Sequence, residues 1–440
     1  MGGDSMITAV IQAGGKGTRL SSVTGDLLPK PMVDVLGKPL LQWQIESLHR
    51  EGISRFIIIV GHLGDVIKNY FDDGKWLNVS IDYILEQNLC GTAGSIYKVR
   101  SFVSDNDFLF VYADAMFDVD VRRMMDFHEK HHSAATLFLH PNNHPFDSDL
   151  VVLDENDKIL GFDGKQNSRN YWYENLVNAG IFIFTPRVFE YLREHEAADV
   201  ERDLLTRMLE NGESLYGYKS SEYVRDAGTV DRLNLVTEDL SKGIVEKRNL
   251  RNAQKAVFLD RDGTINQFRG LLSKEEDLEL EPNAAEAIKR LNQSEYLVFV
   301  VTNQPVVARG LCSIQEVKEI HKKLSSLLGN GGAYYDDLVF CPHHPDKGYK
   351  DENPLYKIKC RCRKPEIGMI VQLAEKYNVD LSQSWMVGDS TVDIKTAENA
   401  GLKSILVRTG ESGNDNKFSV TPQYIADDIL DAVNKILGDK

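Results

Sequence analysis

Two carboxylates separated by a single residue lie a little past the middle of this chain of 440 residues. In the segment DRDGTIN, Asp260 and Asp262 directly follow the apolar stretch KAVFL. Two carboxylates so spaced leave the end of a strand pointing to nearly the same place. One can hold Mg2+ and attack phosphorus while the other transfers protons. Acidic residues after strands also form ordinary turns, so this pair by itself leaves that alternative open.

Further polar groups also lie at the ends of predicted strands or just before a predicted helix. Thr302 ends the apolar run YLVFVVTN, and Lys364 lies just before a helix in CRKPEIG. Another strand ends in VGDSTVD, which supplies Asp389 and Asp393. A hydroxyl can hold a phosphoryl oxygen, and a lysine can neutralise phosphate charge. Together these groups predict a phosphatase site whose nucleophile is Asp260.

This order of motifs resembles the haloacid dehalogenase superfamily of phosphatases, from about Lys255 to the C-terminus. The resemblance implies that Asp260 forms an aspartyl phosphate. Asp262 would protonate the leaving alcohol and then activate water. Thr302 and Lys364 would stabilise the transferring phosphoryl group. The implied Mg2+ ligands are Asp260, Asp262 through its carbonyl oxygen, and Asp389, with Asp393 orienting the acidic loop.

A cysteine and histidine cluster precedes Lys364. The segments CPHHP and CRCRKP offer a Cys3His set, which is an accepted set of structural zinc ligands. The alternative is two reduced cysteine clusters with a stray histidine, and His344 competes with His343 as ligand. Because the loop ends at Arg363 and Lys364, zinc here would be structural and would fix these cations. The predicted ligands are Cys341, His343, Cys360 and Cys362.

The zinc loop resembles that of the D,D-heptose 1,7-bisphosphate phosphatases and of the related histidinol phosphatases. The segment TNQPVVARG is similar to T-N-Q-S-G-I-A-R-G of that branch, with departures at Pro305 and Val306. The resemblance implies an active site without a large cap domain. The substrate-binding residues that it implies are Asn303, Arg309 and Arg363.

The N-terminal part has a different phosphate-binding pattern. QAGGKGTRL follows the apolar stretch ITAVIQ, and LPKPM comes soon after. Glycines let the backbone approach a triphosphate, while Lys16, Arg19 and Lys30 supply positive charge. A tight turn is the alternative for the glycine-rich loop alone. The glycine spacing matches neither a Walker loop nor a dinucleotide fingerprint.

G-G-x-G-T-R-L followed by P-K-P resembles the sugar-1-phosphate nucleotidyltransferases, and the resemblance spans about residues 6–237. It implies that Asp114 and Asp226 hold Mg2+, although Ala113 stands where the family has glycine. Arg19 and Lys30 would neutralise the triphosphate, whose α-phosphorus a sugar 1-phosphate attacks as pyrophosphate leaves. The implied nucleotide-binding residues are Gly14, Gly15, Gly17, Thr18, Gln87, Gly91 and Thr92. The implied sugar-phosphate contacts are Lys165, Asn178 and Gly180.

Strand and helix patterns alternate in both halves, which predicts two doubly wound, Rossmann-like α/β domains. The expected domain limits are 6–240 and 255–440, joined by a charged linker at 241–254. The expected strands are 7–12, 55–61, 108–114, 179–185, 255–260, 296–303, 336–341, 384–389 and 404–408. The expected helices are 39–52, 284–293, 366–377 and 393–401.

Composition limits the partners. The formal charge is −15, from 51 basic and 66 acidic residues, which argues against nucleic acid or an anionic membrane as a partner. No apolar run of about 18 residues appears. Few cysteines, five in all, and no signal-peptide pattern indicate the reducing cytoplasm. The sequence leaves open whether the chain forms a homo-oligomer.

The two predicted activities form consecutive steps. Removal of the 7-phosphate from a heptose 1,7-bisphosphate would leave the sugar 1-phosphate that a nucleotidyltransferase needs. The first domain also resembles the D-glycero-α-D-manno-heptose 1-phosphate guanylyltransferases, so the expected product is GDP-heptose made with GTP. Alternatives are mannose or glucose 1-phosphate with UTP, dTTP, CTP or ATP, a histidinol or general sugar phosphatase, and a noncatalytic ligand sensor. The sequence does not determine the nucleotide base, the preferred anomer, the exact sugar, or whether the intermediate is channelled between the two sites.

Overall fold

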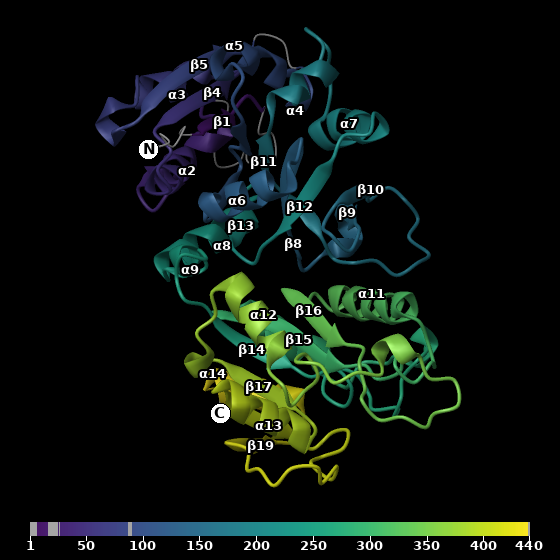
Figure 1. Cartoon of the computed structure of the whole chain (residues 1–440). Coiled ribbons are helices and arrows are strands. Elements are labelled where there is room, and N and C mark those ends of the chain that lie inside the picture. The colour runs from purple at the N-terminus through teal and green to yellow at the C-terminus, as the bar shows by residue number, and fades with distance from the viewer. Residues whose placement is uncertain (1–6, 16–24, 26, 87–89, 439–440) are drawn as a thin grey trace, which may run out of the picture. The chain divides into compact units, whose positions relative to one another are not determined.

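The computed structural model of the chain describes residues 7–15, 25, 27–86 and 90–438 (Figure 1). Its contacts divide the chain into two compact units, and each is described by itself. The limits predicted from the sequence concern independently folding domains and stay a prediction. The first unit is Met1–His140, Val151–Asp163 and Asn178–Asn249, and the second is Pro141–Leu150, Gly164–Val177 and Leu250–Lys440.

The first unit is built on a mixed sheet. Its strands are β1 (Thr8–Gln12), β4 (Arg55–Val60), β5 (Ser80–Leu85), β6 (Phe108–Tyr112), β8 (Ala135–His140), β9 (Leu150–Leu153), β10 (Ile159–Asp163), β11 (Val177–Phe184) and β12 (Leu215–Lys219). Their order is β10-β9-β11-β6-β1-β4-β5, with β8 beside β11 and β12 beside β8. β1 is parallel to β4 and β6, whereas β11 is antiparallel to β6. The doubly wound expectation therefore fits the centre of this sheet, and its far side is mixed.

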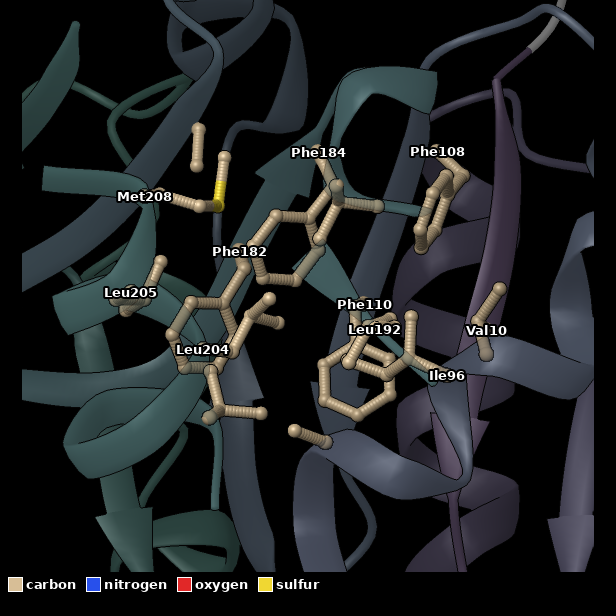
Figure 2. Packing of buried hydrophobic residues seen from close by; sticks show 14 of the residues in the cluster. Val10, Ile96, Phe108, Phe110, Phe182, Phe184, Leu192, Leu204, Leu205 and Met208 are labelled. Carbon is tan, nitrogen blue, oxygen red and sulfur yellow. The ribbon is translucent and has the colours of Figure 1, made fainter. Parts of the chain in front are cut away.

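Helices cover both faces of this sheet because alternate strand residues point to opposite sides. Ile58 packs with α2 (Leu40–Arg50), α3 (Gly64–Phe71) and α6 (Val121–His131). Ile57 packs in the opposite cluster, part of which Figure 2 shows around Phe110, Phe182 and Phe184. The helices of that second face are α4 (Gly91–Gly94), α5 (Arg100–Val103), the π-helix Val200–Leu205 and α7 (Thr206–Glu210).

Smaller ribbons complete the first unit. β7 (Ala115–Asp118) pairs antiparallel with β13 (Tyr223–Asp226), which brings Ala115 opposite Asp226. α8 (Val230–Ser241) and α9 (Ile244–Lys247) pack beside this ribbon. A short hairpin joins β2 (Asp34–Val35) to β3 (Lys38–Pro39). The β7–β13 ribbon matters for function because a candidate site residue lies at one end of each strand.

The second unit is built on a fully parallel sheet. Its strands are β14 (Lys255–Leu259), β15 (Tyr296–Asn303), β16 (Asp337–Cys341), β17 (Trp385–Gly388), β18 (Lys403–Val407) and β19 (Tyr424–Ala426). Their order is β16-β15-β14-β17-β18-β19. Each neighbouring pair is parallel, so all carboxyl ends meet at one edge. The ends of β14, β15 and β17 therefore converge, as ligand sites of such sheets require.

Two helical layers enclose the parallel sheet. Val257 packs against α10 (Ala284–Asn292), α11 (Ile314–Asn330) and α14 (Ile429–Leu437). Phe258, the next residue, packs on the opposite face against α12 (Gly368–Tyr377), with α13 (Thr391–Ala400) beside it. This alternation fixes the register of β14, so Asp260 follows at the carboxyl edge of the sheet.

Two segments from the first half of the sequence pack on α11 within the second unit. The backbone N–H groups of Tyr173 and Asn175 donate to the hydroxyls of Ser326 and Ser325, at 3.1 and 3.2 Å. The Lys323 ammonium lies 5.4 Å from the Trp172 ring centroid. A Cβ at Gly329 would come within 2.5 Å of Pro145 Cγ, so a side chain there would displace Pro145.

Every strand and helix expected from the sequence is present, with ends that differ by one to a few residues. The strands that the sequence did not predict are β5, β8, β9, β10, β12 and β19 in the two main sheets, and the short ribbon strands β2, β3, β7 and β13. Among the described residues, no helix is long and apolar enough to cross a bilayer.

Phe182 tests the packing of the first unit. It is fully buried in the cluster of Figure 2. Phe182→Ala should lower the free energy of unfolding of this unit by about 3–5 kcal/mol, because a large cavity replaces the ring. Leu160→Ala, at a strand position that is 62% exposed, is the matched control and should change it by no more than about 0.5 kcal/mol. Urea unfolding followed by circular dichroism measures both, and equal midpoints would contradict this packing.

Candidate active sites

Three carboxylates gather at the carboxyl edge of the parallel sheet. Asp260 follows β14 and Asp389 follows β17, while Asp393 lies in the first turn of α13. One oxygen of each lies within 4.8 Å of the others, and all three residues are buried. The sequence predicted this convergence from the order of the strands. Asp260 and Asp389 are two of the predicted Mg2+ ligands, and carboxylate oxygens are the ligands that Mg2+ prefers.

The Lys364 ammonium is placed among these carboxylates. Its Nζ lies 2.7 Å from Asp260 Oδ1 and 2.6 Å from Asp393 Oδ1. The other oxygen of Asp393 accepts hydrogen bonds from the hydroxyl and N–H of Ser390, the N-cap of α13. Asp393 is therefore held by the helix cap and by Lys364, which agrees with an orienting role.

The electrostatics of this cluster call for more positive charge. Burial raises the pKa of Asp260 to about 7, against the opposing charge of Lys364. Burial, followed by the charges of Asp260 and Asp393, raises the pKa of Asp389 to about 9. Burial by itself would lower the pKa of Lys364, but Asp260 and Asp393 raise it above its ordinary value. The single positive charge of Lys364 thus lies among three buried carboxylates, and a divalent cation would neutralise the remaining negative charge.

Asp262 is held by polar side chains from several loops. Its carboxylate accepts from Arg261 at 2.8 Å, from Gln304 at 2.8 Å and from Asn266 at 3.0 Å. Gln304 Nε2 also donates to the hydroxyl of Thr302 at 2.8 Å. Gln304 therefore links the predicted acid–base carboxylate to the predicted phosphate-binding hydroxyl.

Sequence reasoning missed Arg261 and Gln304. Arg261 is fully buried, and its Nη1 lies 3.1 Å from the Nε2 of His321. Burial, with the Arg261 charge adding to it, holds the pKa of His321 well below its usual range, so the imidazole accepts this hydrogen bond. Arg261 lies between the two aspartates in sequence, and Gln304 follows Asn303. The signal that could have identified both residues is their position inside motifs whose other residues were already predicted to be functional.

Asn303 and Lys364 are joined through a reciprocal pair of hydrogen bonds. Asn303 Nδ2 donates to the Lys364 carbonyl at 3.1 Å, and the Lys364 N–H donates to Asn303 Oδ1 at 3.0 Å. The resemblance implied substrate contact for Asn303, and that stays a prediction. What the structure shows is that Asn303 fixes the backbone of the loop that presents Lys364.

The side chains of the cysteine and histidine cluster lie close enough together to bind one tetrahedral metal ion. The three Sγ atoms lie 3.2 to 3.5 Å apart, far longer than a disulfide, and His343 Nδ1 lies 3.3 Å from Cys362 Sγ. His344 is outside the cluster, because its Nδ1 accepts from the Asp346 N–H instead. The four members are Cys341, His343, Cys360 and Cys362.

Cations surround His344 beside this cluster. Arg363 donates to the His343 carbonyl at 3.2 Å, which ties the zinc loop to the residue before Lys364. Burial, then the charges of Arg363, Arg309 and Lys357, lower the pKa of His344 to about 4. The predicted substrate-binding residues Arg309 and Arg363 therefore lie close together.

The candidate site of the first unit centres on two carboxylates. Lys30 Nζ lies 2.9 Å from Asp114 Oδ2 and 3.5 Å from Asp226 Oδ1. Arg232 pairs with the other oxygen of Asp226, and the Gly228 N–H donates to Asp226 at 2.7 Å. The β7–β13 ribbon brings both aspartates together, as the predicted metal site requires. Arg232, which sequence reasoning missed, lies six residues after Asp226 in α8.

Backbone geometry explains two of the predicted glycines. Gly180 has φ +76°, and a Cβ there would lie 2.5 Å from the Tyr112 ring. A Cβ at Gly91 would lie 2.3 Å from the Ala198 carbonyl oxygen. Thr92, beside Gly91, donates to Asp199 at 3.0 Å. The packing and hydrogen bonds of the fold therefore account for these residue types, and the ligand contacts predicted for them stay predictions.

The remaining predicted residues are placed as follows. Asn178 in β11 donates to Glu201 and accepts from the Gly180 N–H. Gly14 follows β1, and a Cβ there would approach Glu86. Lys165 belongs to the second unit, where its N–H donates to Asp149 at 2.7 Å. Gly15 is described, whereas Lys16, Gly17, Thr18, Arg19 and Gln87 lie outside the described residues.

Comparison with known proteins gives a match for each unit. The nucleotidyl transferase family model matches residues 8–243, and the HAD-hydrolase-like model matches residues 361–432. The D-glycero-beta-D-manno-heptose-1,7-bisphosphate 7-phosphatase of Rhodopseudomonas palustris is 42% identical over 147 residues, which are 33% of this chain and 79% of that protein.

Two curated relatives match the first unit. The UTP–glucose-1-phosphate uridylyltransferase of a Synechocystis species is 31% identical over 235 residues, which are 50% of this chain and 60% of that protein. The mannose-1-phosphate guanylyltransferase of Mycobacterium tuberculosis is 29% identical over 246 residues, which are 56% of this chain and 67% of that protein. The two relatives differ in both nucleotide and sugar.

Fold, sites and relatives define a bifunctional α/β enzyme, with a nucleotidyltransferase and a phosphatase in one chain. The chain belongs to the nucleotidyl transferase family, and its C-terminal part belongs to the family of the heptose-1,7-bisphosphate 7-phosphatases. The haloacid dehalogenase resemblance and the α/β fold class predicted from the sequence are thereby confirmed.

The Asn303–Lys364 pair gives a test of positioning. Asn303→Ala removes both hydrogen bonds to the lysine loop and should lower the kcat of phosphate release about 10–100-fold, because Lys364 is no longer fixed beside Asp260. The control is Asn399→Ala, which removes a hydrogen bond from an exposed side chain to the carbonyl of Pro365, the residue after Lys364. This variant should retain activity. Phosphate release from a sugar phosphate measures both. An unchanged kcat for Asn303→Ala would contradict the positioning role.

Proposed function

We propose that the chain catalyses two consecutive steps in the synthesis of a nucleotide-activated heptose. The second unit removes the 7-phosphate of D-glycero-D-manno-heptose 1,7-bisphosphate. The first unit joins the resulting heptose 1-phosphate to a nucleotide, with GTP favoured, to give GDP-heptose and pyrophosphate. The carrying observation is that one chain unites a nucleotidyl transferase with a phosphatase unit whose relatives are named for heptose 1,7-bisphosphate.

In the proposed phosphatase step, Asp260 attacks the phosphorus of the 7-phosphate and forms an aspartyl phosphate. Asp262 protonates the departing O7 and then takes a proton from the water that hydrolyses the intermediate. Lys364 and the Thr302 hydroxyl stabilise the phosphoryl oxygens during both transfers. Mg2+ bound by Asp260, Asp389 and the Asp262 carbonyl would supply charge neutralisation.

In the proposed nucleotidyl step, an oxygen of the sugar 1-phosphate attacks the α-phosphorus of the triphosphate and pyrophosphate leaves. The Lys30 ammonium lies between Asp114 and Asp226, where the proposed Mg2+ would bind. Asp114 and Asp226 would hold this Mg2+, which would offset the negative charge of the triphosphate, and Lys30 would contact the phosphates. Asn178 and Gly180 are proposed to contact the sugar phosphate, and Arg19 the triphosphate. The resemblance implied the same role for Lys165, which belongs to the second unit, and for that residue the role stays a prediction.

We further propose that Cys341, His343, Cys360 and Cys362 hold a structural Zn2+. The closed set of four soft and borderline ligands supports this, since it leaves no open coordination position for catalysis. The loop that the ion closes continues directly into Arg363 and Lys364. Zinc would therefore fix the phosphate-binding lysine indirectly.

Product analysis tests the two-step proposal. The full chain supplied with α- or β-heptose 1,7-bisphosphate and each nucleoside triphosphate should release phosphate and form GDP-heptose, identified by mass. Asp260→Asn should abolish phosphate release but still convert supplied heptose 1-phosphate. Asp114→Asn should show the reverse. A nucleotide-sugar formed with UTP and glucose 1-phosphate instead would favour the activity of the uridylyltransferase relative. Loss of both activities in either variant would contradict two separate sites.

Metal analysis tests the zinc proposal. The chain as purified should contain about one zinc per chain, and Cys360→Ser should lose it. The same variant should lower phosphatase kcat about 10–100-fold, because the lysine loop is no longer fixed. Cys312→Ala, a cysteine outside the cluster, is the matched control and should keep the metal. Elemental analysis of the two variants decides, and equal zinc content would contradict the assignment.

A further inference from the structure

One buried glutamine spans the turn that presents Asp114. This turn, formed by Ala113 and Asp114, joins β6 to β7. Gln44 of α2 is fully buried, and its Nε2 donates to the Tyr112 carbonyl at 3.0 Å and to the Ala115 carbonyl at 2.5 Å. The two acceptors lie directly before and directly after the turn. A single amide group therefore fixes both ends of the turn.

The amide oxygen of Gln44 indicates why a glutamine occupies this place. Both neighbours of Nε2 are carbonyl oxygens, so the amide nitrogen must face them. The other amide atom, Oε1, is buried and has no hydrogen-bond donor within the described part of the chain. An acceptor buried without a partner destabilises a fold, and an apolar side chain would avoid this cost. The two donated hydrogen bonds therefore account for the residue type.

The same helix also fixes the far end of β7. The carboxylate of Asp118, the last residue of β7, is buried and accepts from Ser47 Oγ at 3.2 Å and from Arg50 Nη2 at 2.7 Å. Asn249 Nδ2 donates to the same carboxylate at 2.9 Å. Gln44, Ser47 and Arg50 follow one another at intervals of three residues, so they share one face of α2. This face of α2 holds β7 at both ends.

The place of Asp114 determines whether it can share a cation with Asp226. The Lys30 ammonium lies 2.9 Å from Asp114 Oδ2 and 3.5 Å from Asp226 Oδ1, so the space between the carboxylates accepts positive charge. Carboxylate oxygens also suit Mg2+, which requires nearly ideal octahedral geometry. A small displacement of the turn would therefore weaken the binding of Mg2+ by Asp114.

We propose that Gln44 is a positioning residue for the Mg2+ site of the nucleotidyl step, because it fixes the turn from which Asp114 reaches the metal. The inference rests on the proposed function of the first unit and assigns Gln44 no contact with substrate or metal. Loss of its two hydrogen bonds frees the turn and weakens Mg2+ binding, while the pairing of β7 with β13 preserves the ribbon. The phosphatase step depends on residues of the second unit and is an internal control in the same chain.

Gln44→Met tests this role, since methionine has a similar length and no N–H donor. The Mg2+ concentration that gives half-maximal nucleotidyl transfer should rise about 10-fold, because residues that hold a metal ligand contribute about 10–100-fold to metal affinity. Phosphate release by the same chain should not change. Gln44→Asn, whose shorter side chain cannot span both carbonyls, should shift the Mg2+ requirement in the same direction. A lower kcat with an unchanged Mg2+ requirement would indicate a loss of folded protein and would overturn the proposal.

The matched control is Gln42→Met. Gln42 is a second buried glutamine of α2, but its amide bonds to the side chains of Glu46 and Tyr70, at 2.7 and 2.8 Å. This variant should leave the Mg2+ requirement of nucleotidyl transfer unchanged. An equal shift in both variants would show that the loss of any buried amide in α2 has this effect, and the specific role of Gln44 would be overturned.

Metal binding without turnover separates this inference from the proposed function. Mn2+ retained with the protein on ultrafiltration is measured in the presence of each non-hydrolysable nucleoside triphosphate. Asp114→Asn identifies the site of the first unit by the Mn2+ that it loses, and Gln44→Met should weaken that site about 10-fold. Unchanged binding in Gln44→Met, with loss in Asp114→Asn, would overturn the positioning role and keep the nucleotidyl site. Equal retention by the wild type and Asp114→Asn would refute the proposed metal site itself, and the role of Gln44 with it.

Discussion

The contact of Lys364 with Asp260 and Asp393 is the constraint around which the phosphatase unit is arranged. Three buried carboxylates would repel one another, and the ammonium allows them to share one place. Bringing a lysine there requires a loop that is fixed at several points. Asn303 fixes its backbone, and the cysteine cluster lies directly before it. Removing any of these supports should therefore disturb the charge balance at Asp260 more than it disturbs the sheet.

The first unit also holds carboxylates together beside one lysine, but fewer surrounding residues fix their positions. Asp114 and Asp226 lie 112 residues apart in sequence and meet only because β7 and β13 pair. Lys30 reaches both from a short helix after the glycine-rich loop. Both aspartates are 38–47% exposed, whereas the carboxylates of the second unit are buried. The more open arrangement suits the proposed binding of Mg2+ together with a triphosphate.

The sequence was most informative where chemistry and strand ends coincide. Asp260, Thr302 and Asp389 each end a buried apolar strand, so a parallel sheet must bring them to one edge. β7, β8 and β12 were not predicted, because their short and partly polar runs lack a clear period and take their identity from neighbours. Gln304 and Arg261 were missed for a related reason, since amides and arginines have many ordinary uses. Their roles appear only when the folded chain shows which carboxylate they contact.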